Sequence, residues 1–162
     1  MPELPEVQTT VNGLNRTVRD RIIKSISTTY KSAYYAGKDN IKDPGFFKKF
    51  KALVTGQKIL KAERRAKNVL IHLSNKYTII VHMKMTGHFV YDRPGYPYVR
   101  LTFRLNNGKE LSLSDIRKFA KVTLVKTAAV EKSMHLEGLG PEPLDRNFQF
   151  KIFNFQLHKR PK

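Results

Sequence analysis

The chain contains no cysteine and few acidic residues, 13 among 162. The absence of cysteine excludes disulfide bonds and every zinc site that is built on cysteine ligands. No apolar run approaches the roughly 18 residues needed to cross a membrane. The first residues also lack the basic region and apolar stretch of a secretory signal, so we expect a cytoplasmic protein.

Positive charge is in large excess, because 31 Lys and Arg face the 13 acidic residues and the net charge is +18. Such an imbalance favours a polyanionic partner, of which nucleic acid is the simplest. An anionic membrane surface is the rival partner, but no strongly basic amphipathic helix supports it. The length and the 40% share of apolar residues fit one globular domain with its own core.

Apolar spacing predicts a helix over residues 5–18 and a second helix that starts at Asp43-Pro44 and ends at Gly56. A further helix is predicted over 127–137, and a last one from Phe148 onward. Strands are predicted over 22–30, 57–60, 68–73, 77–83, 99–105, 111–113 and 121–125. Short turns between them favour antiparallel pairing. The predicted fold class is therefore α+β: a two-layer antiparallel β-sandwich with an N-terminal helix and further flanking helices.

The first six residues, Met1-Pro2-Glu3-Leu4-Pro5-Glu6, form a candidate catalytic group. If Met1 is removed, Pro2 presents a secondary α-amine, and α-amines titrate at about pH 7.7–8.0. Its unprotonated form can attack an electrophilic carbon and form a Schiff base, with Glu3 and Glu6 as neighbouring acid/base groups. The alternative is a plain helix N-terminus, where Pro and Glu are both favoured.

Three further clusters combine cations with apolar side chains. Residues 64–67 (Arg-Arg-Ala-Lys) are expected to open a strand, His82–Gly87 to close one, and Asp115–Phe119 to follow another. Cations that hold phosphates, together with apolar wedges, are used by proteins that kink DNA and extrude a base. The alternatives are a solvated charge run at 64–67, a structural His82, and core positions for Met85 and Phe119.

These motifs, followed by Leu139-Gly140-Pro141-Glu142-Pro143-Leu144, occur in an order that resembles the formamidopyrimidine-DNA glycosylase family. The resemblance covers essentially the whole chain. It implies a catalytic domain over residues 1–144, and a linker or helix over 145–162 that leads towards a second half. It also implies a monomer that acts on double-stranded DNA with an oxidised purine or an abasic site. The implied activity is base excision followed by β- and δ-elimination.

The resemblance implies catalytic roles for three residues. Pro2 would be the nucleophile at deoxyribose C1′, Glu3 would protonate the opening sugar ring, and Glu6 would help to hold the proline or a water molecule. An iminium at C1′ would acidify the C2′ proton, so strand cleavage follows from the same nucleophile.

The resemblance also implies DNA contacts. Lys67 and His82 would bind phosphates beside the lesion, and Met85 would fill the space left by the extruded nucleotide. Arg117 would contact the orphaned cytosine, and Phe119 would wedge between bases.

The chain departs from the family at five positions near these residues. The family usually has Glu at Gln8, Pro at Ile116, Arg at Lys118 and Gly at Ala120, and it commonly has Gly at Lys84. Lys84 and Ala120 are larger than the glycines of the family and lie near the turns expected to face DNA, so they are expected to affect how the wedging side chains are placed.

The family continues with a helix-two-turn-helix module and a four-cysteine zinc finger. We therefore expect no cofactor in this chain, since zinc belongs to that second half. The chain is interpreted as a piece of a longer protein or as a reduced relative. The rival interpretations are a non-catalytic basic DNA- or RNA-binding module with the same fold, and a ribosome-associated basic protein.

Overall fold

A computed structural model describes residues 3–30 and 37–136. The chain divides into two compact units, Met1–Ala128 and Ala129–Lys162. In the second unit, helix α3 (Val130–Leu136) follows a short 3₁₀ turn, η2 (Thr127–Ala129), which confirms the helix predicted over 127–137. The boundary predicted at residue 144 and the helix predicted from Phe148 lie outside the described residues and stay predictions. Among the described helices, none has both the length and the apolar character needed to span a bilayer.

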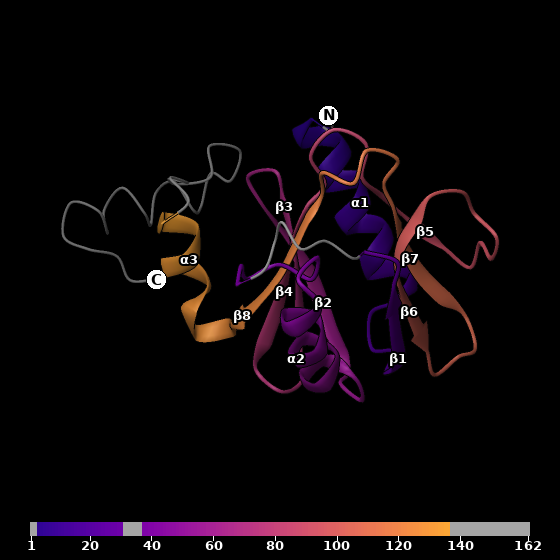
Figure 1. Cartoon of the computed structure of the whole chain (residues 1–162), viewed down its shortest axis with the longest axis horizontal. Helices are drawn as coiled ribbons and strands as arrows, with labels where there is room; N and C mark the ends of the chain where they lie inside the picture. Colours follow the sequence, from indigo (N-terminus) through magenta and orange to yellow (C-terminus); the bar gives the residue numbers. More distant parts are fainter. Residues whose placement is uncertain (1–2, 31–36, 137–162) are drawn as a thin grey trace. The chain divides into compact units, whose positions relative to one another are not determined.

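The first unit is built from two four-stranded antiparallel sheets (Figure 1). The first sheet has the order β1 (Ile23–Thr28), β6 (Val99–Leu105), β7 (Glu110–Ser114), β5 (His88–Tyr91). The second sheet has the order β2 (Ile59–Arg65), β3 (Asn68–Leu73), β4 (Tyr77–His82), β8 (Lys121–Lys126). The predicted α+β class with antiparallel sheets is confirmed.

The inner faces of the two sheets share one core. Strict alternation along β6 buries Leu101, Phe103 and Leu105, as expected for a strand with one face in the core. The central strands β3 and β4 of the second sheet bury most of their residues, as expected from the apolar runs 69–71 and 79–81 at their centres. The hydrophobic pattern therefore distinguishes a sheet with one covered face from a sheet whose central strands are buried on both faces.

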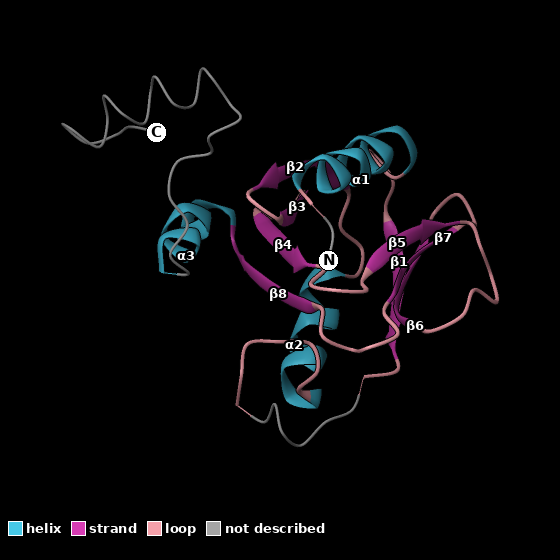
Figure 2. Cartoon of the chain, turned by 90° about the horizontal axis from the view of Figure 1, so that it is seen from above, coloured by secondary structure: helices cyan, strands magenta, loops and turns pink. Residues whose placement is uncertain are grey.

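Figure 2 shows helices α1 (Leu4–Thr17) and α2 (Pro44–Val54) at opposite sides of the space between the two sheets. The buried side of α1 carries Val7, Val11 and Leu14. Asn15 fixes α1 to β2, because its side chain donates to the Ala62 carbonyl at 3.0 Å and accepts from the Ala62 amide at 2.8 Å.

The predicted start of α2 is confirmed. The Asp43 carboxylate caps the helix by accepting a hydrogen bond from the Phe46 amide at 3.2 Å, and Pro44 occupies the first turn. Phe50 is fully buried, with its ring centroid 6.4 Å from that of Phe103 in β6. The cap therefore fixes the residue at which α2 begins, and Phe50 on this helix packs in the core.

Three details of the strand prediction were wrong. The strand predicted over 57–60 begins later and is longer, because β2 runs over Ile59–Arg65. Arg64 and Arg65 end β2 instead of opening a strand, and Ala66 and Lys67 form the hairpin turn to β3. Ala66 has a φ of 52°, the left-handed conformation that tight hairpins require. Strand β5 was not predicted, because its four residues are too few to show an alternation and its burial is only partial.

A polar chain crosses the second sheet on the face of Glu63, His72 and Thr78. His72 Nε2 lies 3.1 Å from Glu63 Oε1, and its Nδ1 lies 2.8 Å from Thr78 Oγ1. Thr78 Oγ1 in turn lies 2.8 Å from Thr127 Oγ1. The hydrogen bond from His72, aided by Lys61 and opposed by burial, lowers the pKa of Glu63 to about 2 from an ordinary 4.5.

The substitution Glu63→Gln is expected to make the free energy of unfolding less sensitive to acid. The folded state favours the charged carboxylate, so its stabilisation is present above about pH 4.5 and is lost as the pH falls towards 2. Since the Glu63 side chain is 46% exposed, the lost contribution is about 1 kcal/mol or less. Urea unfolding at about pH 5 and about pH 2 measures it. His72→Gln should give a similar reduction, and a wild-type acid response in Glu63→Gln would contradict the assignment.

Candidate functional site

The N-terminus of α1 brings two of the predicted clusters together. Glu3 is the N-cap residue, and Glu6 Oε1 accepts a hydrogen bond from the Glu3 amide at 2.7 Å, which closes a capping box. The Glu3 carboxylate also lies 3.7 Å from Lys67 Nζ, and the two side chains are 69% and 34% exposed. Pro2, the predicted nucleophile, precedes Glu3 and lies outside the described residues. Glu6 therefore holds the backbone directly after Pro2, and Glu3 and Lys67 form an accessible pair beside it.

The turn that carries Lys67 is tied to α1 through Arg64. Arg64 Nε donates to Gln8 Oε1 at 3.1 Å, and Arg64 Nη1 donates to the Ala66 carbonyl at 3.1 Å. The solvated-charge alternative is therefore wrong for Arg64, which bridges the helix and the turn. The neutral amide of Gln8 accepts this hydrogen bond from Arg64. With the glutamate that the family usually has at position 8, the same contact would be an ion pair.

Strand register places His82 beside the Lys67 turn. His82 pairs with Asn68 on one side and with Lys121 on the other. Neighbouring strands are about 4.8 Å apart, so the start of β3, the end of β4 and the start of β8 together span about 10 Å. The basic residues at this edge of the sheet include Lys67, His82 and Lys121. His82 Nδ1 accepts a hydrogen bond from the Lys84 amide at 3.1 Å, which fixes the start of the turn that follows.

Met85, Arg117 and Phe119 come together on neighbouring turns. Met85 is 49% exposed and Phe119 is 52% exposed, so the core alternative for these two residues is wrong. Arg117 Nη1 lies 3.8 Å from Met85 Sδ, and the Arg117 guanidinium carbon lies 6.0 Å from the centroid of the Phe119 ring. An exposed cation is thus flanked by two exposed apolar side chains. We call Met85, Arg117 and Phe119 the wedge cluster.

The two turns that carry the wedge cluster have backbone conformations that favour glycine. A Cβ at Gly87 would stand 2.6 Å from the Met83 carbonyl oxygen, so only glycine fits where the first turn closes. Lys84 and Lys118 have φ values of 54° and 59°, in the left-handed region. The conformation at Lys84 gives a physical reason for the glycine that the family commonly has there.

Two buried charged residues lie beneath the same turns, of which sequence reasoning missed Lys42 and gave Asp115 no role of its own. Lys42 is 3% exposed, and its Nζ donates a hydrogen bond to the Lys118 carbonyl. Burial lowers the pKa of Lys42, although the charge of Asp115 opposes that shift. Asp115 is itself fully buried. A lone carboxylate inside a basic cluster was a usable signal for Asp115, whereas nothing local marked Lys42, 76 residues away from Lys118.

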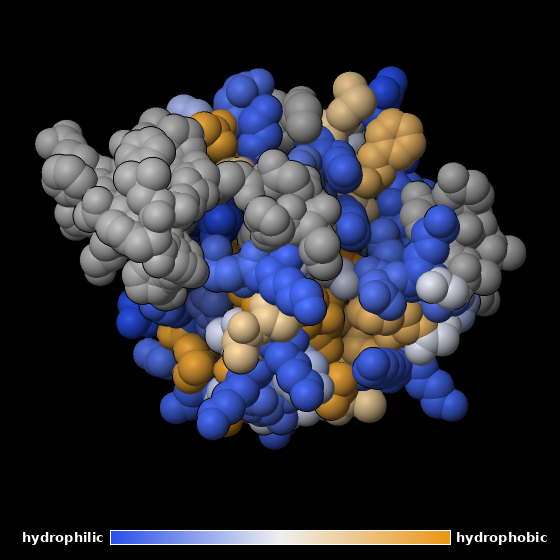
Figure 3. All heavy atoms as spheres, turned by 90° about the vertical axis from the view of Figure 1, so that its left-hand side faces the viewer, coloured by the Kyte–Doolittle hydropathy of each residue, from blue (hydrophilic) through white to orange (hydrophobic). Residues whose placement is uncertain are grey.

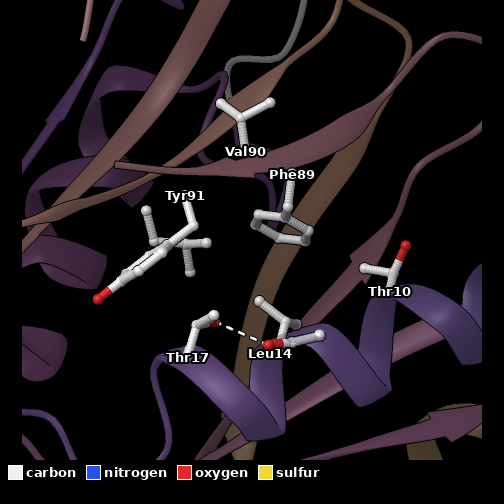
Figure 4. A pocket seen from close by; sticks show the side chains of 8 residues that line it. Thr10, Leu14, Thr17, Phe89, Val90 and Tyr91 are labelled. Atoms are coloured by element: carbon white, nitrogen blue, oxygen red, sulfur yellow. Dashed lines mark hydrogen bonds between the residues drawn. The ribbon is translucent and has the colours of Figure 1, made fainter. Parts of the chain in front are cut away.

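A separate apolar hollow of about 170 Å³ opens between α1 and the first sheet (Figure 4). Its walls include Leu14 of α1 and Phe89, Val90 and Tyr91 of β5. On the helix side, Thr17 Oγ1 donates back to the Gly13 carbonyl at 2.8 Å, which leaves its methyl group towards the apolar lining. This hollow lies along the C-terminal part of α1, so it is not part of the arrangement around Glu3.

Hydrophilic residues dominate the visible coloured surface in Figure 3, with small hydrophobic areas between them. In residues 3–30 and 37–136, no three His, Cys, Asp or Glu side chains gather closely enough to hold a metal ion.

The family model described as the formamidopyrimidine-DNA glycosylase N-terminal domain matches residues 1–122. The chain belongs to the formamidopyrimidine-DNA glycosylase family. A formamidopyrimidine-DNA glycosylase of Protochlamydia amoebophila is 38% identical over 99% of the chain, and one of Oceanobacillus iheyensis is 36% identical over 98%. Each alignment covers 55% of the relative, so the chain spans about half the length of these curated proteins.

Solved structures of the family show the same fold. The Lactococcus lactis enzyme in complex with DNA containing FAPY-dG matches with a TM-score of 0.75 and 28% identity, over 87% of this chain and 51% of that one. The same enzyme bound to DNA with an abasic site also matches with a TM-score of 0.75. The formamidopyrimidine-DNA glycosylase fold predicted from the motifs is thus confirmed, and the roles of the individual site residues stay predictions.

Proposed function

We propose that the chain is the catalytic half of a DNA glycosylase and abasic-site lyase that removes oxidised purines. The observation that carries the proposal is the convergence at the ends of β3, β4 and β8. There Lys67, which pairs with Glu3 at the capped N-terminus of α1, directly precedes Asn68, the residue that pairs with His82, and the wedge cluster lies on the turns that follow β4 and precede β8. The solved relatives that hold damaged or abasic DNA support this partner. A DNA substrate supports a location in the cytoplasm or nucleoid.

The proposed reaction uses the α-amine of Pro2. The amine nitrogen attacks C1′ of the damaged nucleotide, and the glycosidic bond breaks with its electron pair passing to the departing base. Glu3 donates a proton to the ring oxygen as the C1′–O4′ bond opens, which leaves an iminium. The iminium acidifies C2′, so a water molecule can take the C2′ proton and leave an enamine. The enamine then expels the 3′ phosphate, as the C3′–O bond breaks with its electron pair on the phosphate oxygen. Glu6 positions this centre, because it bonds the amide of the residue that follows Pro2.

The proposed DNA contacts divide into anchoring and wedging groups. Lys67, in the turn before β3, and His82, at the end of the neighbouring strand β4, bind phosphates that flank the lesion. Met85 and Phe119 present exposed apolar surface that can replace the stacking of an extruded nucleotide. Arg117 between them supplies hydrogen-bond donors for the base left without a partner.

Borohydride trapping tests the proposal. The 162-residue chain is incubated with duplex DNA that carries one abasic site, and the reductant converts the Schiff base into a stable amine. We expect a covalent protein–DNA complex that undamaged duplex does not give. The rival, a non-catalytic binding module, predicts binding to both duplexes and no covalent complex with either.

The substitution Lys67→Ala is expected to weaken DNA binding and to reduce its salt dependence. The logarithm of the binding constant falls with the logarithm of salt concentration by about 0.9 per phosphate neutralised, so the slope should decrease by about one. Fluorescence anisotropy with duplex DNA at several salt concentrations measures the slope. Lys126→Ala is the control, because Lys126 ends β8 at the opposite end of the sheet. Equal slopes for Lys67→Ala and the unaltered chain would remove Lys67 from the phosphate contacts.

A further inference from the structure

A buried carboxylate lies directly beneath the wedge cluster. Asp115 is fully buried, and its oxygens accept hydrogen bonds from Thr86 Oγ1 at 2.5 Å, the Ala120 amide at 2.8 Å and the Tyr30 hydroxyl at 3.3 Å. The three donors belong to three segments: the β4–β5 turn, the end of the β7–β8 loop, and the residues after β1. A buried carboxylate is unfavourable unless its oxygens are satisfied, so Asp115 draws these segments to one point.

Thr86 extends this link to the wedge cluster itself. Its hydroxyl donates to Asp115 and accepts a hydrogen bond from the Arg117 amide at 3.1 Å. One hydroxyl thus joins the turn that carries Met85 to the loop that carries Arg117. Met85 directly precedes Thr86 in the sequence, and Phe119 directly precedes Ala120, whose amide bonds the carboxylate. Each wedge side chain is therefore at most two residues from an atom in this network.

We propose that Asp115 and Thr86 are a positioning pair that holds Met85, Arg117 and Phe119 as one preorganised unit before DNA arrives. The inference rests on the proposed function for its consequence, since a wedge that is already ordered loses less conformational entropy on binding. Neither residue of the pair is assigned contact with the DNA. Asp115 is buried, and the Thr86 hydroxyl is used by protein groups on both sides.

Removal of one hydroxyl at a time separates positioning from general stability. Thr86→Val keeps the shape of the side chain and deletes the link to the wedge cluster. Tyr30→Phe deletes a hydroxyl that reaches the same carboxylate from the residues after β1. Thr86→Ser retains the hydroxyl and serves as the conservative rescue. Thermal midpoints of all three variants report the general cost of each lost hydrogen bond.

The first readout is the preference for duplex with a stable abasic-site analogue over undamaged duplex. We expect Thr86→Val to reduce that preference about tenfold, as for loss of a buried hydrogen bond, while Tyr30→Phe and Thr86→Ser stay within about twofold. An equal reduction in Thr86→Val and Tyr30→Phe would overturn the proposal, because it would reduce Asp115 to a structural role.

The second readout needs no DNA. The chain has no tryptophan, so Phe119→Trp places a single tryptophan in the wedge cluster, which can be excited at wavelengths that the seven tyrosines do not absorb. In that background Thr86→Val is expected to lower the steady-state anisotropy of the tryptophan, and Thr86→Ser to preserve it. Unchanged anisotropy in Thr86→Val would overturn the positioning pair. If the unaltered chain shows no preference for abasic DNA, the proposed function fails, and the anisotropy still decides on the pair.

Discussion

Blocking the α-amine of Pro2 is expected to abolish the covalent complex with abasic DNA. Acetylation of the N-terminus removes the nucleophilic lone pair, and retention of Met1 moves the amine to another residue, so neither form can make an iminium through Pro2. Because the step depends on one atom, the expected loss is complete. Trapping by borohydride, followed by gel electrophoresis, measures it for protein whose N-terminus has been established by intact mass.

The control for this experiment is non-covalent binding. Glu3 and Lys67 meet through their side chains, and the capping box uses Glu6, so the blocked forms should keep the binding surface. Their affinity for abasic duplex, measured without borohydride, should stay within a few-fold of the free form, as for a single contact of modest energy. A covalent complex that survives both blocks would assign the nucleophile to a lysine and would refute the role of Pro2.

The substitution Glu3→Gln is expected to separate base excision from abasic-site cleavage. A positioned general acid contributes roughly 10²–10⁴-fold, so excision of 8-oxoguanine should fall by at least about 100-fold. Trapping at a preformed abasic site should fall much less, because the base is already gone and the sugar opens readily. The glutamine keeps an oxygen that can accept the capping hydrogen bond, so the helix should survive the change. Single-turnover assays on the two substrates measure the separation.

Glu110→Gln is the matched control for Glu3→Gln. Glu110 also pairs with a cation, Arg104, at 2.6 Å, but it lies in the first sheet, away from the start of α1. Its loss should leave the ratio of the two activities unchanged. If Glu3→Gln lowers excision and trapping by the same factor, Glu3 supports the fold of the N-terminus and is not the acid. Where the 162-residue chain alone excises too slowly, the same pair of variants can be compared in a chain extended by the second half of a relative.

The fold was largely predictable because its strands carry strong local patterns. The alternation in β6 and the apolar runs of β3 and β4 indicate which faces are buried. The short strand β5 carries no such pattern, and its position depends on its pairing with β7. The turn at Ala66 was misread because a left-handed alanine has no signature in the sequence.

The site was predictable as a set of clusters, but not as an arrangement. Motifs identified Glu3 and Lys67, yet their 3.7 Å approach joins residues 64 positions apart (67 − 3) and arises only when α1 packs on β2. Likewise, no periodicity indicated that Met85 and Phe119 are about half exposed. Asp115 and its partner Tyr30 are separated by 85 positions, so their contact follows from the tertiary structure alone.

The left-handed turns constrain how this surface can change through evolution. Ala66, Lys84 and Lys118 each hold a positive φ beside the candidate site, and that conformation costs a residue with a side chain about 1–2 kcal/mol. Glycine at Lys84 or Lys118 would relieve the cost and remove a cation, whereas a β-branched residue would raise the cost further. Single mutations at these two positions therefore trade stability against positive charge, and few substitutions keep both.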